Sequence, residues 1–495
     1  MKRALINVWI VLLIVGGCLL FQRNRPPNVM LVVLDAVRAD ALSSYGYERE
    51  TTPFIDTLAS KGLVYSRAYS PSSWTMPSHA SIFTGQTPYE HGCHHVHAYL
   101  VDRHNTLAEA LRDRGYVTAA FNANPVISKD NNLLQGFETI DEVWRTHDPS
   151  KLDYRGSEYT NEQVKAWIAR TKEPWFVFIN YMDAHNPYWP PVEYRNRYLR
   201  GDLGPIASLA NINNMSVLSG KLKLAPGDYR QLRNLYDGSI SYLDYIVSDL
   251  MSAVNKRTTL VIITSDHGEA FGEHGHFTHN SLLYRELLHV PLIFYGKNIN
   301  EPMIDDGLVS IKDIYRAILE ASPYNLSSGS PVMAFHYPSL TNRWINKHKS
   351  TGFSLIDGRM HYIAFQKELP EVYDDEGELI NLCPSSISPL TVQKVINDQL
   401  RNIDAFVERD EDLKSDDSLQ DEFRLAKLRT LGYSGGEVAP NISAHAEVHL
   451  NRGVAFARIG RFDLALKEMQ KAQKIQPYNK RVNQVLLAIR NKVGK

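Results

Sequence analysis

Short, almost uninterrupted apolar runs recur along the chain and alternate with amphipathic segments. The clearest runs are Asn28 to Leu34, Tyr116 to Phe121, Trp175 to Asn180, Leu260 to Thr264 and Pro291 to Tyr295. Runs of this length and composition are typical of strands buried on both faces of a sheet. Apolar residues at helical spacing occupy Asp228 to Lys256, and shorter helices are expected at Pro53 to Ala59 and Asn105 to Arg114. This alternation predicts an α/β fold whose mostly parallel sheet carries helices on both faces.

A smaller region follows, which we place at residues 301–437. It contains an expected helix from Lys312 to Glu320 and an expected strand from His361 to Gln366. These elements predict a smaller α+β subdomain. Leu431 to Gly436 interrupts the helical pattern with glycines and marks a domain boundary.

The last segment, residues 440–495, is expected to form an α-helical tail. Its small and apolar residues fit one tetratricopeptide-like repeat of 34 residues at about 446–479: Gly453, Phe456, Gly460, Phe462, Ala465, Met469, Ala472 and Pro477. About three such repeats are normally needed for independent stability. We therefore expect this unit to bind a protein partner or to cap the main domain, and the sequence leaves both options open.

The first 25 residues form a basic and apolar segment. Lys2 and Arg3 precede an uncharged run from Ala4 to Phe21, long enough to span a bilayer core of roughly 30 Å. This pattern predicts an uncleaved membrane anchor or a signal peptide, and an extracytoplasmic location for the rest of the chain. Val15 to Cys18 also resembles a lipoprotein cleavage box, in which Cys18 would carry the lipid.

Composition excludes some classes of function. The 495 residues carry a net charge of −1, so nothing indicates nucleic-acid binding. Three cysteines are too few for a disulfide framework.

One hydroxyl residue stands out beside a predicted helix start. Thr75 lies two residues before Pro77, which suits the first position of a helix. A hydroxyl placed there would face free backbone N–H groups and the positive end of the helix dipole. Thr75 could therefore be a nucleophile or simply an N-cap.

Four motifs together resemble the sulfatase family of the alkaline phosphatase superfamily. They are the opening segments Asn28 to Asp40 and Thr52 to Ala59, the nucleophile segment Thr75 to Gly85, the downstream metal segment Ser265 to Gly275, and the strand entry Leu288 to Ile293. The resemblance runs in order from about residue 27 to 435. It implies an alkaline-phosphatase-like fold, with a catalytic domain at 27–300 and a C-terminal subdomain at 301–437.

The resemblance also implies a metal centre. Asp35, Asp266 and His267 would hold one divalent ion, and Thr75 would supply the nucleophile and a fourth ligand. Mixed oxygen and nitrogen ligation suits Zn²⁺ or Mn²⁺, with Mg²⁺ and Ca²⁺ as alternatives. A metal-bound hydroxyl ionises more readily, which would activate the threonine.

The chain also departs from the sulfatase pattern. Sulfatases place Cys or Ser where Thr75 stands and oxidise it to formylglycine, and they carry Arg at the position of His79. Threonine cannot become formylglycine, so none is expected. Ala36 replaces a second Asp that is common in sulfatases. These departures favour a phosphate ester over a sulfate ester as the substrate.

Histidines are expected to line the substrate site. His185 matches a substrate-binding histidine of the family that can act as a general acid, and His279 falls where the family often has lysine. We therefore predict His185 and His279 as proton donors to the leaving group, and both, with His79 and His94, as substrate contacts. Asp183, His185 and His279 could alternatively hold a second metal ion.

Three further interpretations remain open at this point. The protein could be a sulfatase that works without formylglycine, or a transferase that moves the headgroup of a membrane lipid or glycan. It could also be an inactive scaffold that uses the repeat to bind a partner.

Overall fold

The architecture is taken from a computed structural model of the chain. It describes residues 26–94, 98–145, 156–200, 223–279, 282–326, 331–336, 352–357, 359–365, 371–374, 462–475 and 485–490. The predicted N-terminal anchor lies outside these residues. In the part of the chain that is described, no helix combines the length and hydrophobicity required to cross a membrane.

An eight-stranded sheet forms the centre of the main domain, in the order β10-β2-β9-β6-β1-β5-β3-β4. Strand β1 (Asn28–Leu34) lies between β5 (Trp175–Tyr181) and β6 (Thr259–Thr264) and is parallel to both. The other strands are β2 (Leu63–Tyr69), β3 (Val117–Asn122), β4 (Thr139–Glu142), β9 (Leu292–Gly296) and β10 (Met303–Ser310). Strand β9 runs antiparallel to its neighbours β2 and β6, so the sheet is mixed but mostly parallel, as the α/β prediction requires.

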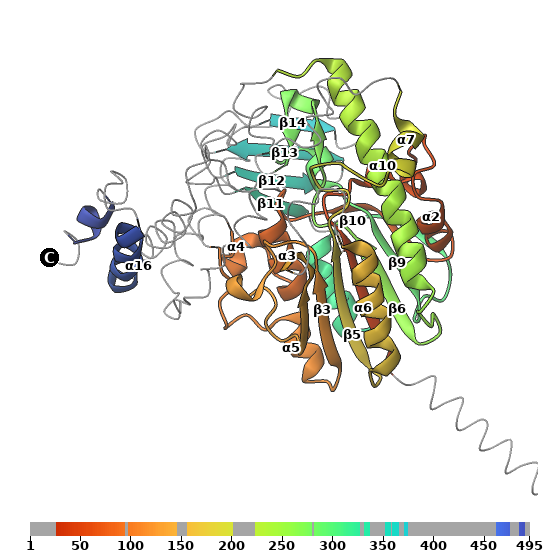
Figure 1. Ribbon diagram of the computed structural model, residues 1–495, viewed down its shortest axis with the longest axis horizontal. Coiled ribbons are helices and arrows are strands. Elements are labelled where there is room, and N and C mark those ends of the chain that lie inside the picture. Colours follow the sequence, from red (N-terminus) through yellow and green to blue (C-terminus); the bar gives the residue numbers. More distant parts are fainter. Residues whose placement is uncertain are drawn as a thin grey trace, which may run out of the picture.

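Helices cover both faces of this sheet (Figure 1). The side chains of β1 alternate between two apolar cores, with Met30, Val32 and Leu34 in one and Val29, Leu31 and Val33 in the other. The first core is completed by α2 (Pro53–Ala59), α6 (Ser157–Arg170), α7 (Val192–Tyr198) and α10 (Pro226–Met251), and the second by α3 (Thr75–Thr84), α5 (Leu107–Arg112) and α12 (Ile314–Leu319). This double burial explains why the strands read as continuous apolar runs.

A second sheet is small and antiparallel, in the order β11-β12-β13-β14. Its strands are β11 (Val332–His336), β12 (Gly352–Asp357), β13 (Met360–Phe365) and β14 (Glu371–Asp374). Strand β10 pairs with β2 and α12 packs in the main core, so the first sheet extends beyond residue 300. The division between the two sheets therefore falls after α12, later in the chain than the expected boundary.

The tail is described in part. Helix α16 (Phe462–Ile475) buries Ala465, Met469 and Ala472, three of the small and apolar positions expected to pack in the repeat. These residues form an apolar cluster with Leu486, Ile489 and Val101, the last from the loop before α5. The first half of the repeat lies outside the described residues, so the tetratricopeptide-like unit stays a prediction.

Candidate metal centre

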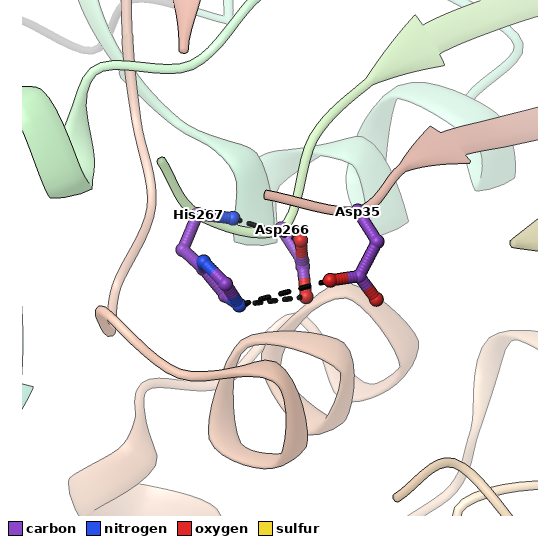
Figure 2. Close-up of side chains that lie close together, drawn as sticks. All are labelled: Asp35, Asp266 and His267. Carbon is purple, nitrogen blue, oxygen red and sulfur yellow. Dashed lines mark hydrogen bonds and ion pairs between the residues drawn. The ribbon is translucent and has the colours of Figure 1, made fainter. Parts of the chain in front are cut away.

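Three predicted ligands meet at one edge of the main sheet. Asp35 directly follows β1, and Asp266 and His267 follow the neighbouring strand β6. Because parallel strands end at the same edge of a sheet, the two segments converge there. One ligand atom from each of the three buried side chains lies within 4.8 Å of the others, as Figure 2 shows. The structure therefore brings together the ligand set that the sequence predicts.

Hydrogen bonds orient both carboxylates. Asp35 Oδ2 accepts from the side-chain amides of Asn124 at 2.8 Å and Asn180 at 3.1 Å. Asp266 Oδ1 accepts from the backbone N–H groups of Ala36 at 3.2 Å and His267 at 3.0 Å. The other oxygen of each carboxylate is buried and has no hydrogen-bond partner among the described residues. Each acid thus keeps one oxygen for a cation.

The imidazole of His267 is set up as a metal ligand. Its Nδ1–H donates to the carbonyl oxygen of Gly268 at 2.9 Å, which leaves the lone pair on Nε2. This Nε2 lies 3.4 Å from Asp266 Oδ2 and 3.9 Å from Asp35 Oδ1 (Figure 2). Burial lowers the pKa of His267 to about 4, so the ring is neutral at neutral pH.

The charge of the cluster also fits a divalent cation. Burial, together with the Asp266 carboxylate, raises the pKa of Asp35 to about 7. Burial raises the pKa of Asp266 to about 7 as well. Two acids placed together in a dry site repel each other when ionised, and a bound cation removes that cost. Two carboxylate oxygens and one imidazole nitrogen suit Zn²⁺ or Mn²⁺.

Thr75 lies at the same centre. It stands at the start of α3, the helix that packs in the second apolar core. Its Oγ1 lies 3.2 Å from His267 Nε2, although the two residues are 192 positions apart. Helix α3 begins at Thr75, with Trp74 as its N-cap, so the predicted start at Pro77 is two residues late. Pro77 still belongs to the first turn, where its missing N–H has no partner to lose. Thr75 is therefore the first helical residue and not the N-cap.

His79 lies one turn further along α3 and is fully buried. Its Nδ1–H donates to the carbonyl oxygen of Thr75 at 2.9 Å, and its ring packs against Phe83 and Phe178. Burial lowers the pKa of His79 to about 3. The ring thereby supports the turn that carries Thr75, and its predicted contact with the substrate stays a prediction.

Two more predicted histidines lie beside the ligands. The His279 ring centroid is 4.3 Å from that of His267 and 4.9 Å from that of His185. His185 Nδ1–H donates to the carbonyl oxygen of Asn186 at 2.7 Å. His94 is also buried, in the loop after the short helix α4 (Pro88–His91).

A second metal centre does not assemble among the described residues. Within them, only Asp35, Asp266 and His267 come together at ligand distances. The carboxylate of Asp183, the acid expected in such a centre, accepts a hydrogen bond from Ser157 Oγ. The substrate contacts predicted for His185 and His279 stay predictions.

The sequence interpretation missed three side chains. Asn124 and Asn180 fix Asp35, and Glu269 Oε1 accepts from His279 Nδ1 at 3.0 Å. Glu269 is fully buried, and burial raises its pKa to about 8. A signal was present for Asn180, because it is a polar residue near the end of an apolar strand next to β1.

Comparisons with known proteins identify the family and the fold. The model of the sulfatase family matches residues 27–324, more than half of the chain. Human iduronate 2-sulfatase is 26% identical over 355 residues, which are 58% of this chain and 63% of that protein, slightly less than two thirds of its length. The Δ4,5-hexuronate-2-O-sulfatase of Bacteroides thetaiotaomicron is 21% identical over 79% of this chain and 91% of its own.

The fold is likewise shared with solved structures. The crystal structure of the phosphonate monoester hydrolase of Agrobacterium radiobacter superposes with a TM-score of 0.58, at 18% identity, over 77% of this chain and 95% of that one. The protein is thus an ester hydrolase with the fold of the alkaline phosphatase superfamily, and it belongs to the sulfatase family.

Proposed function

We propose that this protein is a metal-dependent hydrolase of phosphate esters, rather than sulfate esters, and that Thr75 is its nucleophile. The observation that carries the proposal is the position of Thr75 Oγ1, 3.2 Å from His267 Nε2 in the Asp35, Asp266 and His267 cluster. The hydroxyl is fully buried at the first turn of α3, where the helix dipole favours negative charge.

The residues divide the reaction into two displacements. A divalent ion held by Asp35, Asp266 and His267 would lower the pKa of the Thr75 hydroxyl and polarise the ester. Thr75 Oγ1 attacks phosphorus as its proton passes to His185 or His279, the bond to the ester oxygen breaks, and the histidine gives that oxygen the proton. Water then attacks the phosphothreonine, which releases phosphate and restores the Thr75 hydroxyl.

The preference for phosphorus follows from the side chain itself. A sulfatase with formylglycine releases sulfate by elimination from a hemiacetal, because the carbon that holds the sulfate carries a second hydroxyl. The side-chain carbon of Thr75 carries one oxygen and a methyl group, so sulfate cannot be released from it by this elimination. The covalent intermediate must instead be opened by attack on the transferred group, for which an in-line displacement at phosphorus is suited.

A second candidate is a sulfuric ester hydrolase that works without formylglycine. It is favoured by the names of the relatives, which are sulfatases. A headgroup transferase would use the same first step, with an acceptor alcohol in place of water. The proposal also includes a membrane tether through the N-terminal segment, an extracytoplasmic location and a protein partner for the C-terminal repeat.

The test is turnover of a panel of aryl esters by residues 27 onward, loaded with Mn²⁺ or Zn²⁺. The panel holds a phosphate monoester, a phosphate diester, a phosphonate and a sulfate. We expect turnover of one of the phosphorus esters, with a loss of at least about 100-fold in Thr75→Val. Thr84→Val, at the other end of α3, is the matched control and should keep its turnover. Sulfate turnover alone would favour the second candidate, and turnover that survives Thr75→Val would refute the nucleophile.

A further inference from the structure

A pocket of about 830 Å³ lies where three segments of the main domain meet. The segments are the loop after β1, the first turns of α10, and β7 (Ala270–Phe271) with the turn that follows it. The volume is within the range of sites that hold small molecules. None of the three predicted metal ligands lines this pocket, so it is separate from the metal centre.

Four aromatic rings line the pocket, and they belong to Tyr45, Tyr47, Tyr229 and Phe271. The three tyrosines are half-buried, so part of each ring is open to a ligand. Gly272, with φ = 106°, lies against the ring of Tyr229, where a Cβ would stand 3.1 Å from the ring carbons. Aromatic rings offer a flat apolar face, which packs well against the C–H groups of a sugar ring.

Two acids of the pocket are neutralised from below by one arginine. Arg38 Nη2 lies 2.6 Å from Asp40 Oδ2, and its Nη1 lies 2.6 Å from Glu273 Oε1. The side chain of Asp40 nevertheless stays 50% exposed. Its carboxylate is therefore fixed in position and still able to accept hydrogen bonds from a ligand.

Another arginine of the pocket lies among the rings. The guanidinium of Arg233 stands 5.0 Å from the ring centroid of Tyr47 and 5.6 Å from that of Phe271. It also pairs with Asp237 at 3.2 Å, and Asp237 is itself paired with Arg49 at 2.6 Å. The charges of this group are thus matched within the protein.

Two more charged residues, Glu48 and Arg230, are exposed at the pocket. They make no ion pair with any residue that the structure describes, and their charges are opposite. The pocket therefore carries no excess of either sign. A sugar hydroxyl can donate to a carboxylate and accept from a guanidinium, so an uncharged ligand with many hydroxyls suits this mixture. An ionic ligand would meet opposing charges on every side.

The pocket is built from the same two segments as the metal centre. Asp40 is five residues after Asp35, and Phe271 is four residues after His267. A fully extended chain covers at most about 3.6 Å per residue, so their Cα atoms lie within roughly 18 Å and 14 Å of those of the ligands. A substrate of several sugar units can therefore reach both places.

We propose that this pocket binds an uncharged sugar unit of the substrate, away from the unit whose ester reacts at the metal centre. The rings would pack on the face of the sugar, and the acids and arginines would bind its hydroxyls. The substrate is then a phosphorylated glycan. Its link to the reaction rests on the proposed function, whereas sugar binding in the pocket does not.

Binding is measured first, by saturation-transfer NMR on the full chain. The probes are maltotriose, cellotriose, mannotriose and tri-N-acetylchitotriose, with trigalacturonate as the anionic comparison. We expect at least one neutral trisaccharide to bind and trigalacturonate to bind more weakly. The absence of binding by every neutral probe, or tighter binding of trigalacturonate, would overturn the proposal.

Two variants locate the bound sugar. We expect Tyr229→Ala to lower its affinity about 5- to 10-fold and Arg230→Gln about 3- to 10-fold. The matched controls are Tyr245→Ala, a 50% exposed tyrosine of α10 outside the pocket, and Arg257→Gln, an exposed arginine beyond the other end of α10. Both should bind like the wild type. Wild-type affinity in both pocket variants would overturn the proposal, and Arg230→Gln alone decides if Tyr229→Ala does not fold.

Turnover tests the link to the substrate. With a phosphate ester of the trisaccharide that binds, Tyr229→Ala and Arg230→Gln should raise KM about 3- to 10-fold and leave kcat unchanged. Their kinetics with an aryl phosphate should equal those of the wild type. An unchanged KM for the sugar ester would overturn the role in substrate binding. If no ester is turned over, the proposed function fails, while the NMR measurement still decides what the pocket binds.

Discussion

At the scale of single residues, the metal centre depends on two carboxylates that each have one oxygen fixed and one oxygen kept for a cation. Asp35 is fixed by two asparagine amides and Asp266 by two backbone N–H groups. This arrangement is costly without a cation, because burial opposes ionisation of both acids. A bound cation would therefore explain why two buried carboxylates, which would otherwise destabilise the fold, lie side by side.

Metal affinity should rise with pH from about 5 and level off above about 7. Protons compete with the cation at Asp35 and Asp266, whose pKa values are raised to about 7. His267 is already neutral, because its pKa is lowered to about 4. Equilibrium dialysis with Mn²⁺ between pH 5 and 8 measures this, and an affinity that does not change over the range would contradict it.

The same shifts make a prediction about folding without metal. Carboxyl groups whose pKa is raised in the fold stabilise it below their unfolded pKa of about 3.9 and lose that effect as pH rises through the folded value. Asp35 and Asp266 should therefore make the metal-free protein less stable at pH 8 than at pH 6. Replacement of both by Asn should flatten this part of the urea unfolding profile.

The ligands could be predicted from sequence because they directly follow strands or stand in recognisable motifs. Glu269 lies within the downstream metal motif, but its contact with His279 could not be predicted, because the two residues come together only in the folded chain. Asn124 lies in a loop, where side chains follow no regular pattern along the sequence. Its hydrogen bond to Asp35 therefore could not be predicted. Such residues become visible only when the backbone is folded.

At the scale of elements, strands β1 and β5 carry asparagines at opposite ends with different tasks. Asn180, near the end of β5, donates to Asp35, whereas Asn28, at the start of β1, accepts from the backbone N–H of Trp175. Asn180→Ala should weaken metal binding about 10- to 100-fold, because Asp35 loses an orienting partner. Asn28→Ala, equally buried, should lower stability and leave metal affinity unchanged, as calorimetric titration would show. Equal affinities in the two variants would contradict this assignment.

Helix α2 is capped by a side chain from another helix. Thr52, the residue before the helix, makes no capping bond to the backbone. The carboxylate of Asp244, on α10, accepts instead from the backbone N–H groups of Phe54 at 3.0 Å and Ile55 at 2.8 Å. Local sequence cannot reveal such a cap, because its donor and acceptor are 189 or more residues apart.

Asp244→Ala should therefore destabilise the protein by about 1–2 kcal/mol, the usual cost of a lost cap. Urea denaturation measures the change. Asp228→Ala, which removes an acid from the first turn of the same α10, serves as the control and should cost less. A loss in Asp244→Ala no larger than that in Asp228→Ala would contradict the capping role of Asp244.

At the scale of the whole molecule, the centre joins three distant segments, namely the end of β1, the start of α3 and the end of β6. The alternation of apolar strands and amphipathic helices predicted these layers. It did not reveal that β9 is antiparallel, nor that β10 and α12 extend the main sheet past residue 300. Strand direction and order are set by pairing between distant segments, which local periodicity does not encode.

Because the ion ties these segments together, metal binding should stabilise the entire main domain. At a free metal concentration of about 100 times Kd, the gain should be about 2.7 kcal/mol. Differential scanning calorimetry with and without a chelator measures it. Asp266→Ala should abolish the gain, and an equal gain in that variant would place the stabilising ion elsewhere.

The central claim is that Thr75 forms the covalent intermediate, and mass spectrometry of the acid-quenched enzyme during turnover of a phosphorus ester tests it most directly. The account predicts a phosphoryl group on the peptide that contains Thr75, present in the metal-loaded wild type and absent from Thr75→Val. Label on another residue, or turnover that persists in Thr75→Val, would contradict it.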